Sequence, residues 1–205
     1  LDIAKSLGLK TKNIDGYAGH VEIGEGEEIL GILCHLDVVP EGSNWTYPPY
    51  AAEIHDGKIY GRGTIDNKGP AIASLYALKA IQDSGIKLNK RVRLILGTDE
   101  ESGWECIRYY LDKEETPALA FSPDAEFPVI HGEKGILTFM LKKSLNNLQS
   151  GKIESIEIEG GNAPNMVPDY CQALIRTDYP EVFRQAVEDY LHNNPGLKID
   201  TEDKD

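Results

Sequence analysis

Short apolar runs, each followed directly by polar or acidic residues, recur along the first 125 residues of the chain. Three of these runs are rich in aliphatic residues and are bounded by turn-forming residues, as is typical of buried strands. They occupy residues 29–34, 92–97 and 118–121. The residues that follow them are His35, Thr98-Asp99-Glu100-Glu101 and Ser122-Pro123-Asp124. The pattern therefore predicts strands whose carboxyl ends carry polar side chains.

Two helical patterns separate these runs. Pro70 suits the first position of a helix, and residues 71–84 are helix-forming until Gly85 closes the pattern. The apolar residues able to share one buried side of this helix are Ile72, Leu75, Tyr76 and Ile81. Residues 104–113 form the second helical pattern. Strands that alternate with helices predict an α/β domain with a mixed, largely parallel sheet and flanking helices.

A less regular segment lies between the first apolar run and the first of these helices. It begins with a loop, residues 40–50, that is rich in proline and aromatic residues. His55-Asp56-Gly57 is typical of a hairpin turn, and the strand pattern after it leads into residues 61–66. This pattern also ends at an acid, Asp66.

The second part of the chain has a different pattern. Strands are expected over 136–141, 153–158, 171–177 and 197–199, and a helix over 180–192. This arrangement is typical of an α+β domain. We therefore expect one domain over residues 1–141 and the start of a second, truncated one over residues 142–205. Because the chain opens within an expected helix and ends in a charged stretch, we expect it to be part of a longer protein.

Composition narrows the function classes. The 205 residues are 40% hydrophobic, and no apolar run approaches the ~18–20 residues of a membrane span, which indicates a soluble protein without a membrane partner. With 34 acidic against 21 basic residues the net charge is −13, so nucleic acid is not an expected partner. Cys34, Cys106 and Cys171 are widely spaced, which favours a reducing compartment, the cytoplasm.

The polar strand ends are candidates for a common site. In open α/β sheets, ligands bind beyond the carboxyl ends of the strands, where His35, Glu100, Glu101 and Asp124 are expected. His35 and Asp37 are two positions apart, so on an extended segment their side chains project to the same side. A histidine with a neighbouring carboxylate is the usual combination of a metal ligand and the group that orients its ring.

Each of these features also has a plain structural interpretation. The Glu100-Glu101 pair could be a solvated acidic turn, and Asp66 and Asp124 could be helix-cap or turn residues. On an extended segment, the two glutamates would point to opposite sides, so one could bind metal while the other handles a proton. Together, however, carboxylates that converge on one crevice would raise each other's pKa, and divalent cations would relieve this repulsion. The joint pattern therefore favours a metal site.

Four ordered motifs resemble one family of enzymes. They are GILCHLDVVP at 31–40, IYGRGTIDNKGP at 59–70, LGTDEE at 96–101 and FSPDAE at 121–126, within a match from about Ile14 to Leu137. The family is the zinc metallopeptidase group that includes aminoacylases, carboxypeptidases, deacylases and bacterial dipeptidases. The likeness is strongest to the bacterial peptidase V type, an Xaa-His dipeptidase. The resemblance implies a zinc-exopeptidase-like catalytic domain, followed by a lid domain.

The resemblance also implies a role for each motif residue. His35 and Asp124 would bind one metal ion, Glu101 the other, and Asp66 would bridge the two, with Asp37 steadying His35 and Glu100 acting as general base. Asn165 resembles a lid residue that helps to hold the substrate. A cis peptide is implied between Asp66 and Asn67. The family's further metal-binding histidine has no counterpart in this chain, so we expect the chain alone to be an incomplete enzyme.

The function implied is a metal-dependent dipeptidase, a hydrolase that cleaves short peptides with water activated by two divalent ions. Zinc is expected, with manganese and cobalt as alternatives that suit the same ligands. Two other functions stay open at this point: an N-acyl amino acid deacylase of the desuccinylase or deacetylase type, and a non-catalytic metal-binding relative. The oligomeric state is also open.

Overall fold

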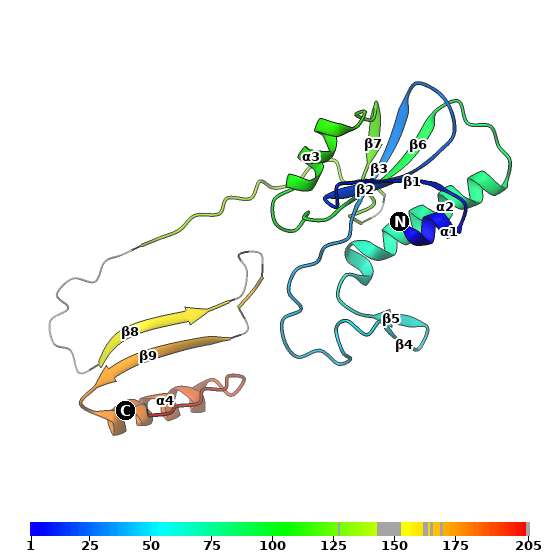
Figure 1. Ribbon diagram of the computed structural model, residues 1–205. Helices are drawn as coiled ribbons and strands as arrows, with labels where there is room; N and C mark the ends of the chain where they lie inside the picture. Colours follow the sequence, from blue (N-terminus) through cyan, green and yellow to red (C-terminus); the bar gives the residue numbers. More distant parts are fainter. Residues whose placement is uncertain (127, 143–152, 162–163, 165, 169, 204–205) are drawn as a thin grey trace. The chain divides into compact units, whose positions relative to one another are not determined.

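The computed structural model describes residues 1–126, 128–142, 153–161, 164, 166–168 and 170–203 (Figure 1). The chain forms two compact units, Leu1–Lys134 and Gly135–Asp205. The domain boundary expected after residue 141 stays a prediction. In the part of the chain that the structure describes, no helix combines the length and the hydrophobicity that a membrane crossing requires.

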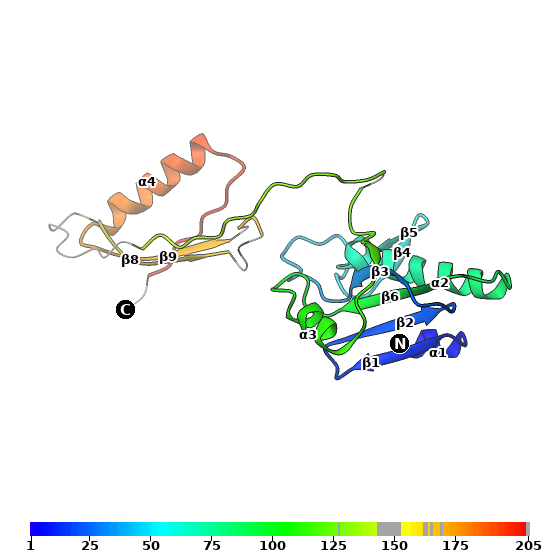
Figure 2. The ribbon, with the colours of Figure 1, turned by 90° about the horizontal axis from the view of Figure 1, so that it is seen from above.

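A five-stranded mixed sheet forms the centre of the first unit (Figure 2). Its strands are β1 Lys10–Ile14, β2 Ala18–Ile23, β3 Ile29–His35, β6 Arg91–Gly97 and β7 Leu119–Phe121. They lie in the order β1-β2-β6-β3-β7, with β3 parallel to β6 and β7 and with β2 antiparallel to β1 and β6. The predicted fold class, a mixed α/β domain with parallel strands at its centre, is confirmed.

Helices cover both faces of this sheet. The first face carries α1 Asp2–Ser6 and α2 Gly69–Asp83, whose side chains enter a core with those of β2, β3 and β6. Helix α3, Glu105–Lys113, packs on a second core that contains Ile95. Its neighbour Leu94 belongs to the first core, as expected because successive strand residues point to opposite faces.

The buried side of α2 differs from the one expected. Ala71, Leu75 and Leu78 are its buried residues, at helical spacings of four and three. Ile72 and Tyr76 are 44% and 53% exposed, so the prediction that they share the buried side is wrong. In the first turn of the helix, Ala71 and not Ile72 is therefore the residue that enters the core.

The segment between β3 and α2 contains the expected hairpin. Strands β4, Glu53–His55, and β5, Lys58–Tyr60, pair antiparallel. Asp56 and Gly57 both have positive φ angles, 49° and 72°, which is the backbone that two-residue hairpin turns require. A single irregular turn, η1 Thr64–Lys68, then leads into α2 and brings Asp66 toward the central sheet.

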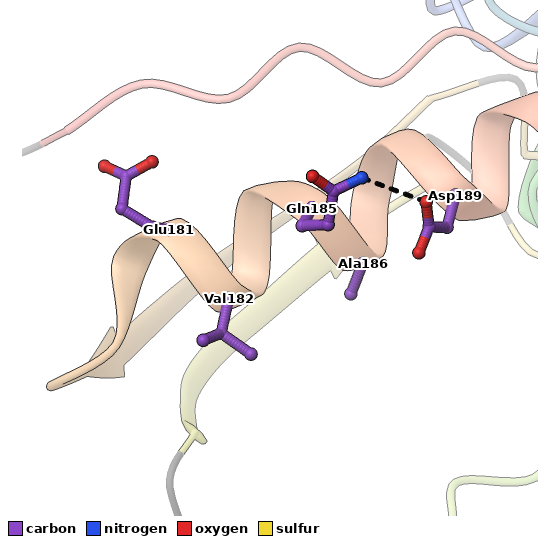
Figure 3. A pocket seen from close by; sticks show the side chains of 5 residues that line it. All are labelled: Glu181, Val182, Gln185, Ala186 and Asp189. Atoms are coloured by element: carbon purple, nitrogen blue, oxygen red, sulfur yellow. Dashed lines mark hydrogen bonds between the residues drawn. The ribbon is translucent and has the colours of Figure 1, made fainter.

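The second unit consists of an antiparallel pair, β8 Ile153–Gly160 and β9 Cys171–Thr177, and the helix α4 Pro180–Asn193. The strands expected over 136–141 and 197–199 are wrong, because the structure forms neither a strand nor a helix at these described residues. A shallow depression on α4 (Figure 3) is lined by Glu181, Val182, Gln185, Ala186 and Asp189. All five come from a single helix, so this depression brings no separate motifs together.

Candidate metal centre

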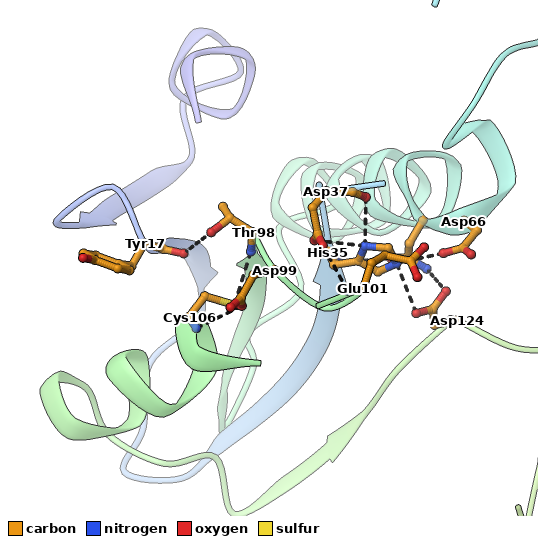
Figure 4. Close-up of polar contacts among 10 residues, drawn as sticks. Tyr17, His35, Asp37, Asp66, Thr98, Asp99, Glu101, Cys106 and Asp124 are labelled. Carbon is orange, nitrogen blue, oxygen red and sulfur yellow. Dashed lines mark hydrogen bonds and ion pairs between the residues drawn. The ribbon is translucent and has the colours of Figure 1, made fainter. Parts of the chain in front are cut away.

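The polar side chains of the four motifs meet at the carboxyl ends of the parallel strands (Figure 4). His35 is the last residue of β3, and the Glu100-Glu101 pair lies in the turn after β6. Asp124 follows β7, and Asp66 lies in η1. The convergence expected from the strand ends is therefore observed.

His35 stands at the centre of the cluster and is only 1% exposed. Its Nδ1 atom lies 3.3 Å from Oδ1 of Asp37 and 3.1 Å from the Asp37 carbonyl oxygen. Its Nε2 atom lies 2.8 Å from Oδ1 of Asp66 and 3.4 Å from Oδ2 of Asp124. Asp37 thus fixes one side of the ring, while the other nitrogen is turned toward two acids, which is the arrangement of an oriented metal ligand.

Asn67 is a site residue that sequence reasoning did not select. Its side chain is fully buried, and its Oδ1 accepts a hydrogen bond from the His35 N–H at 3.3 Å. Its Nδ2 donates to Oδ1 of Asp124 at 2.8 Å and to the Pro123 carbonyl oxygen at 3.3 Å. The Asp66–Asn67 peptide is cis, which confirms the implication of the resemblance. The only indication in the sequence was that Asn67 directly follows Asp66. That its side chain points into the site depends on the local backbone conformation, which the sequence pattern does not reveal.

Glu100 and Glu101 both approach the same imidazole. One ligand atom from each glutamate and one from His35 lie within 4.8 Å of one another. The expectation that the two side chains point to opposite sides is wrong, because the pair lies in a turn beyond the end of β6. The Glu101 N–H donates to Oδ2 of Asp37 at 3.0 Å, so Asp37 contacts both His35 and this turn.

The electrostatics of the cluster are those of crowded acids. Burial raises the pKa of Glu100, and the charges of Glu101, Asp124 and Asp66 raise it further, against the opposing effect of His35. Burial, followed by the charge of Asp66, likewise raises the pKa of Glu101. For His35, burial lowers the pKa, but the hydrogen bond to Asp66 and the neighbouring carboxylates outweigh it, so the net pKa is raised. The protein without metal therefore holds protons at this site more tightly than free side chains would.

The donor set fits divalent metal ions. Two overlapping groups, His35-Asp66-Asp124 and His35-Glu100-Glu101, each place one ligand atom per residue within 4.8 Å of the others. One imidazole nitrogen with several carboxylates suits zinc, manganese or cobalt. A bound cation would offset the repulsion that raises the pKa values of the two glutamates. Asn165, the expected substrate contact, lies outside the described residues.

A second buried histidine has a different environment. His20, on β2, is 6% exposed, and its Nδ1 lies 2.8 Å from the hydroxyl of Tyr110. Arg93 donates to that hydroxyl at 3.2 Å and to Oε2 of Glu22 at 2.7 Å. Burial, reinforced by the charge of Arg93, lowers the pKa of His20. This histidine is part of an ion-paired network that includes no metal-binding motif.

Comparison with known proteins gives a consistent family. Residues 31–197 match the model of Peptidase family M20/M25/M40. A Bacillus subtilis (strain 168) protein named "Putative dipeptidase YtjP" is 46% identical over 192 residues, which are 93% of this chain and 42% of that protein. A Staphylococcus epidermidis (strain ATCC 12228 / FDA PCI 1200) protein named "Putative dipeptidase" is 44% identical over 197 residues, 94% of this chain and 42% of that protein. The chain therefore spans less than half the length of these relatives.

Two of the solved structures that resemble the chain match it over a shorter region. Human carnosine dipeptidase 1 is 28% identical, with a TM-score of 0.47 over 55% of this chain and 27% of its own. An M20 family metallo-carboxypeptidase, Sso-CP2 from Sulfolobus solfataricus, is 31% identical, with a TM-score of 0.47 over the same shares of the two chains.

Proposed function

The chain belongs to Peptidase family M20/M25/M40, and on this premise we propose that it carries the metal-binding half of a dipeptidase active site. The observation on which the proposal depends is the convergence of His35, from the first motif, with carboxylates of the other three motifs. Support for a dipeptide substrate comes from the names of the curated relatives and from the sequence likeness to peptidase V around residues 122–128.

Four residues would hold two divalent ions. His35 and Asp124 would bind one ion, Glu101 the other, and Asp66 would bridge them. The contacts of the His35 Nε2 atom with Asp66 and Asp124, at 2.8 and 3.4 Å, support the first group. Asp37 would act through His35 and through the Glu101 N–H, because its two carboxylate oxygens contact both.

The residues of the chain would then divide the work of peptide hydrolysis. When bound, the divalent ions would supply Lewis acidity, which lowers the pKa of water and polarises a carbonyl group. Glu100 would accept the proton of the attacking water and later deliver it to the leaving amine. The position of Glu100 supports this role, because one of its carboxylate oxygens lies within 4.8 Å of a ring nitrogen of His35 and of a carboxylate oxygen of Glu101.

Two further points concern the form of the protein to assay and its location. The chain spans 42% of the length of the first two relatives, so the full-length protein is the form to assay. We also propose a cytoplasmic location, which is supported by the free thiols of Cys34, Cys106 and Cys171.

A substrate panel tests the proposal. The full-length protein, stripped with chelator and reloaded with zinc, manganese or cobalt, is given dipeptides and N-acyl amino acids. Dipeptide cleavage that chelator abolishes and metal restores is expected. Cleavage of N-acyl amino acids alone would instead identify a deacylase, and inactivity with every metal would identify a non-catalytic relative.

A further inference from the structure

One acid of the third motif has no part in the proposed chemistry. Asp99 directly precedes Glu100 and Glu101, and Figure 4 shows its side chain turned toward Cys106 at the start of α3. Its carbonyl oxygen accepts hydrogen bonds from three consecutive N–H groups, those of Ser102 (3.3 Å), Gly103 (3.1 Å) and Trp104 (3.0 Å). The turn that carries both glutamates is therefore folded around this one residue.

The carboxylate of Asp99 also supplies the cap of α3. Trp104, the N-cap residue, makes no side-chain cap hydrogen bond, and its φ of 63° is left-handed. Instead, the two carboxylate oxygens of Asp99 accept hydrogen bonds from the N–H groups of Glu105 and Cys106, each at 3.0 Å. A carboxylate in this position satisfies free helix donors and interacts favourably with the positive end of the helix dipole. The helix and the turn are thus joined through Asp99.

Further contacts fix the two ends of the same turn. At its start, the Thr98 N–H donates to Sγ of Cys106 at 3.3 Å, and the Thr98 hydroxyl donates to the Tyr17 carbonyl oxygen at 2.6 Å. In its middle, the Glu101 N–H donates to Oδ2 of Asp37 at 3.0 Å. The turn is therefore held from the side of α3 and from the side of His35.

We infer that Asp99 is a positioning residue for Glu100 and Glu101, an inference that rests on the proposed function. Through its carboxylate and its carbonyl oxygen, it anchors the turn to α3 and so fixes both glutamates against His35. Because a displacement of about 1 Å in a catalytic group can cost roughly 10²-fold in rate, the cap of α3 would influence the chemistry without touching the substrate.

The test is Asp99→Asn in the full-length protein. Asparagine keeps one oxygen that can accept a hydrogen bond from the start of α3, but it has no charge. Its NH₂ group would face the second N–H donor and could not accept its hydrogen bond. We therefore expect the helix to persist while the turn before it loosens. We expect kcat to fall by roughly 10- to 100-fold with a smaller change in KM. Two readouts need no turnover: calorimetric affinity for Mn²⁺ should weaken roughly tenfold because Glu101 is displaced, and amide exchange at Cys106 should accelerate.

Two variants of α3 serve as controls. Asp112→Asn makes the same change of charge at an exposed position on the last turn and should leave kcat and Mn²⁺ affinity at the parent values. Tyr110→Phe should lower the free energy of unfolding without changing kcat, and it therefore serves as the control for an effect on stability alone. Parental kcat and Mn²⁺ affinity in Asp99→Asn would overturn the inference, as would equal losses of kcat in Asp99→Asn and Tyr110→Phe.

Failure of the proposed function would look different. In that case the parent protein itself would cleave no dipeptide with any metal. The ratio of Mn²⁺ affinities between the parent and Asp99→Asn would still decide whether Asp99 positions the two glutamates.

Discussion

The two buried histidines of the first unit have opposite electrostatic environments. His35 is 1% exposed and His20 is 6% exposed, so burial alone does not distinguish them. Around His35 the contacts are carboxylates, and the pKa of the ring is raised although burial acts to lower it. Around His20 the network contains the Arg93–Glu22 ion pair, and burial together with Arg93 lowers the pKa of the ring.

This difference separates a ligand-binding site from a structural network. Glu22 balances the charge of Arg93, and Tyr110 provides the hydroxyl that contacts both Arg93 and His20. Near His35, burial and the charges of neighbouring acids instead raise the pKa values of Glu100 and Glu101. Carboxylates that cluster against their mutual repulsion are typical of sites that bind a cation or carry out a reaction. The polar groups at the strand ends therefore point to function, whereas the network on β2, β6 and α3 points to stability.

The largest expected effect is a fall in kcat when a glutamate beside His35 is replaced, but not when a glutamate of the His20 network is replaced. Glu100→Gln should lower kcat about 10²–10⁴-fold, because the amide cannot accept the proton of water, while metal content stays at the parent value. Glu22→Gln, the matched change beside Arg93, should leave kcat unchanged. Steady-state kinetics with metal analysis checks both, and near-parental turnover in Glu100→Gln would remove the general-base assignment.

Tyr110→Phe should produce a loss of stability instead of activity. Removal of the hydroxyl leaves Nδ1 of His20 and one Arg93 donor with fewer partners in a buried place, at a cost of about 1–3 kcal/mol in the free energy of unfolding. Urea unfolding of parent and variant measures this cost, with kcat of the folded protein as the second readout. A parental unfolding curve, or a loss of kcat, would break the distinction between the two regions.

The smallest effect expected is a difference in pH dependence. Because the folded pKa of His20 is lowered, the stability it contributes is present above the unfolded value of about 6.5 and is lost as the pH falls below it. The raised pKa of His35 has the opposite sign in metal-free protein: its contribution is present below about 6.5 and is lost as the pH rises through the folded pKa.

Unfolding of metal-free parent, His20→Gln and His35→Gln at about pH 5.5 and about pH 7.5 tests these signs on either side of the unfolded histidine value. Relative to the parent, His20→Gln should lose less stability on acidification, and His35→Gln should lose more. The same slope for both variants would show that the two environments do not differ as described.

The features of the fold that could be predicted best from the sequence are the apolar strands that are followed directly by polar or acidic residues. The strands β3, β6 and β7 and the convergence of His35, Glu100, Glu101 and Asp124 were predicted from runs of aliphatic residues and from the positions of strand ends. Asp66 joins them from η1 and not from the end of a strand. The hairpin of β1 and β2 did not, since β2 buries Gly19 and His20 within a short and mixed sequence. Parallel strands with continuous apolar runs are more visible than such a strand.

The features of the site that could not be predicted from the sequence are mainly the directions of side chains in irregular backbone. Asn67 and Asp99 orient their neighbours through a cis peptide turn and through a capped loop, and neither geometry has a periodic signature in the sequence. The inward approach of both Glu100 and Glu101 was missed for the same reason, because strand alternation does not extend into a turn. Residues 136–141 are apolar enough for a strand, but the described residues offer them no partner.

Isothermal titration with Mn²⁺ tests most directly whether the cluster around His35 is a divalent metal site. The full-length protein, freed of metal, is compared with Asp66→Asn and with Asp112→Asn, which makes the same change at an exposed position of α3. We expect saturable binding by the parent and by Asp112→Asn, and binding that is weaker by roughly tenfold or more by Asp66→Asn, because a proposed shared ligand is lost. Equal binding by the parent and Asp66→Asn, or no binding by the parent, would contradict this expectation.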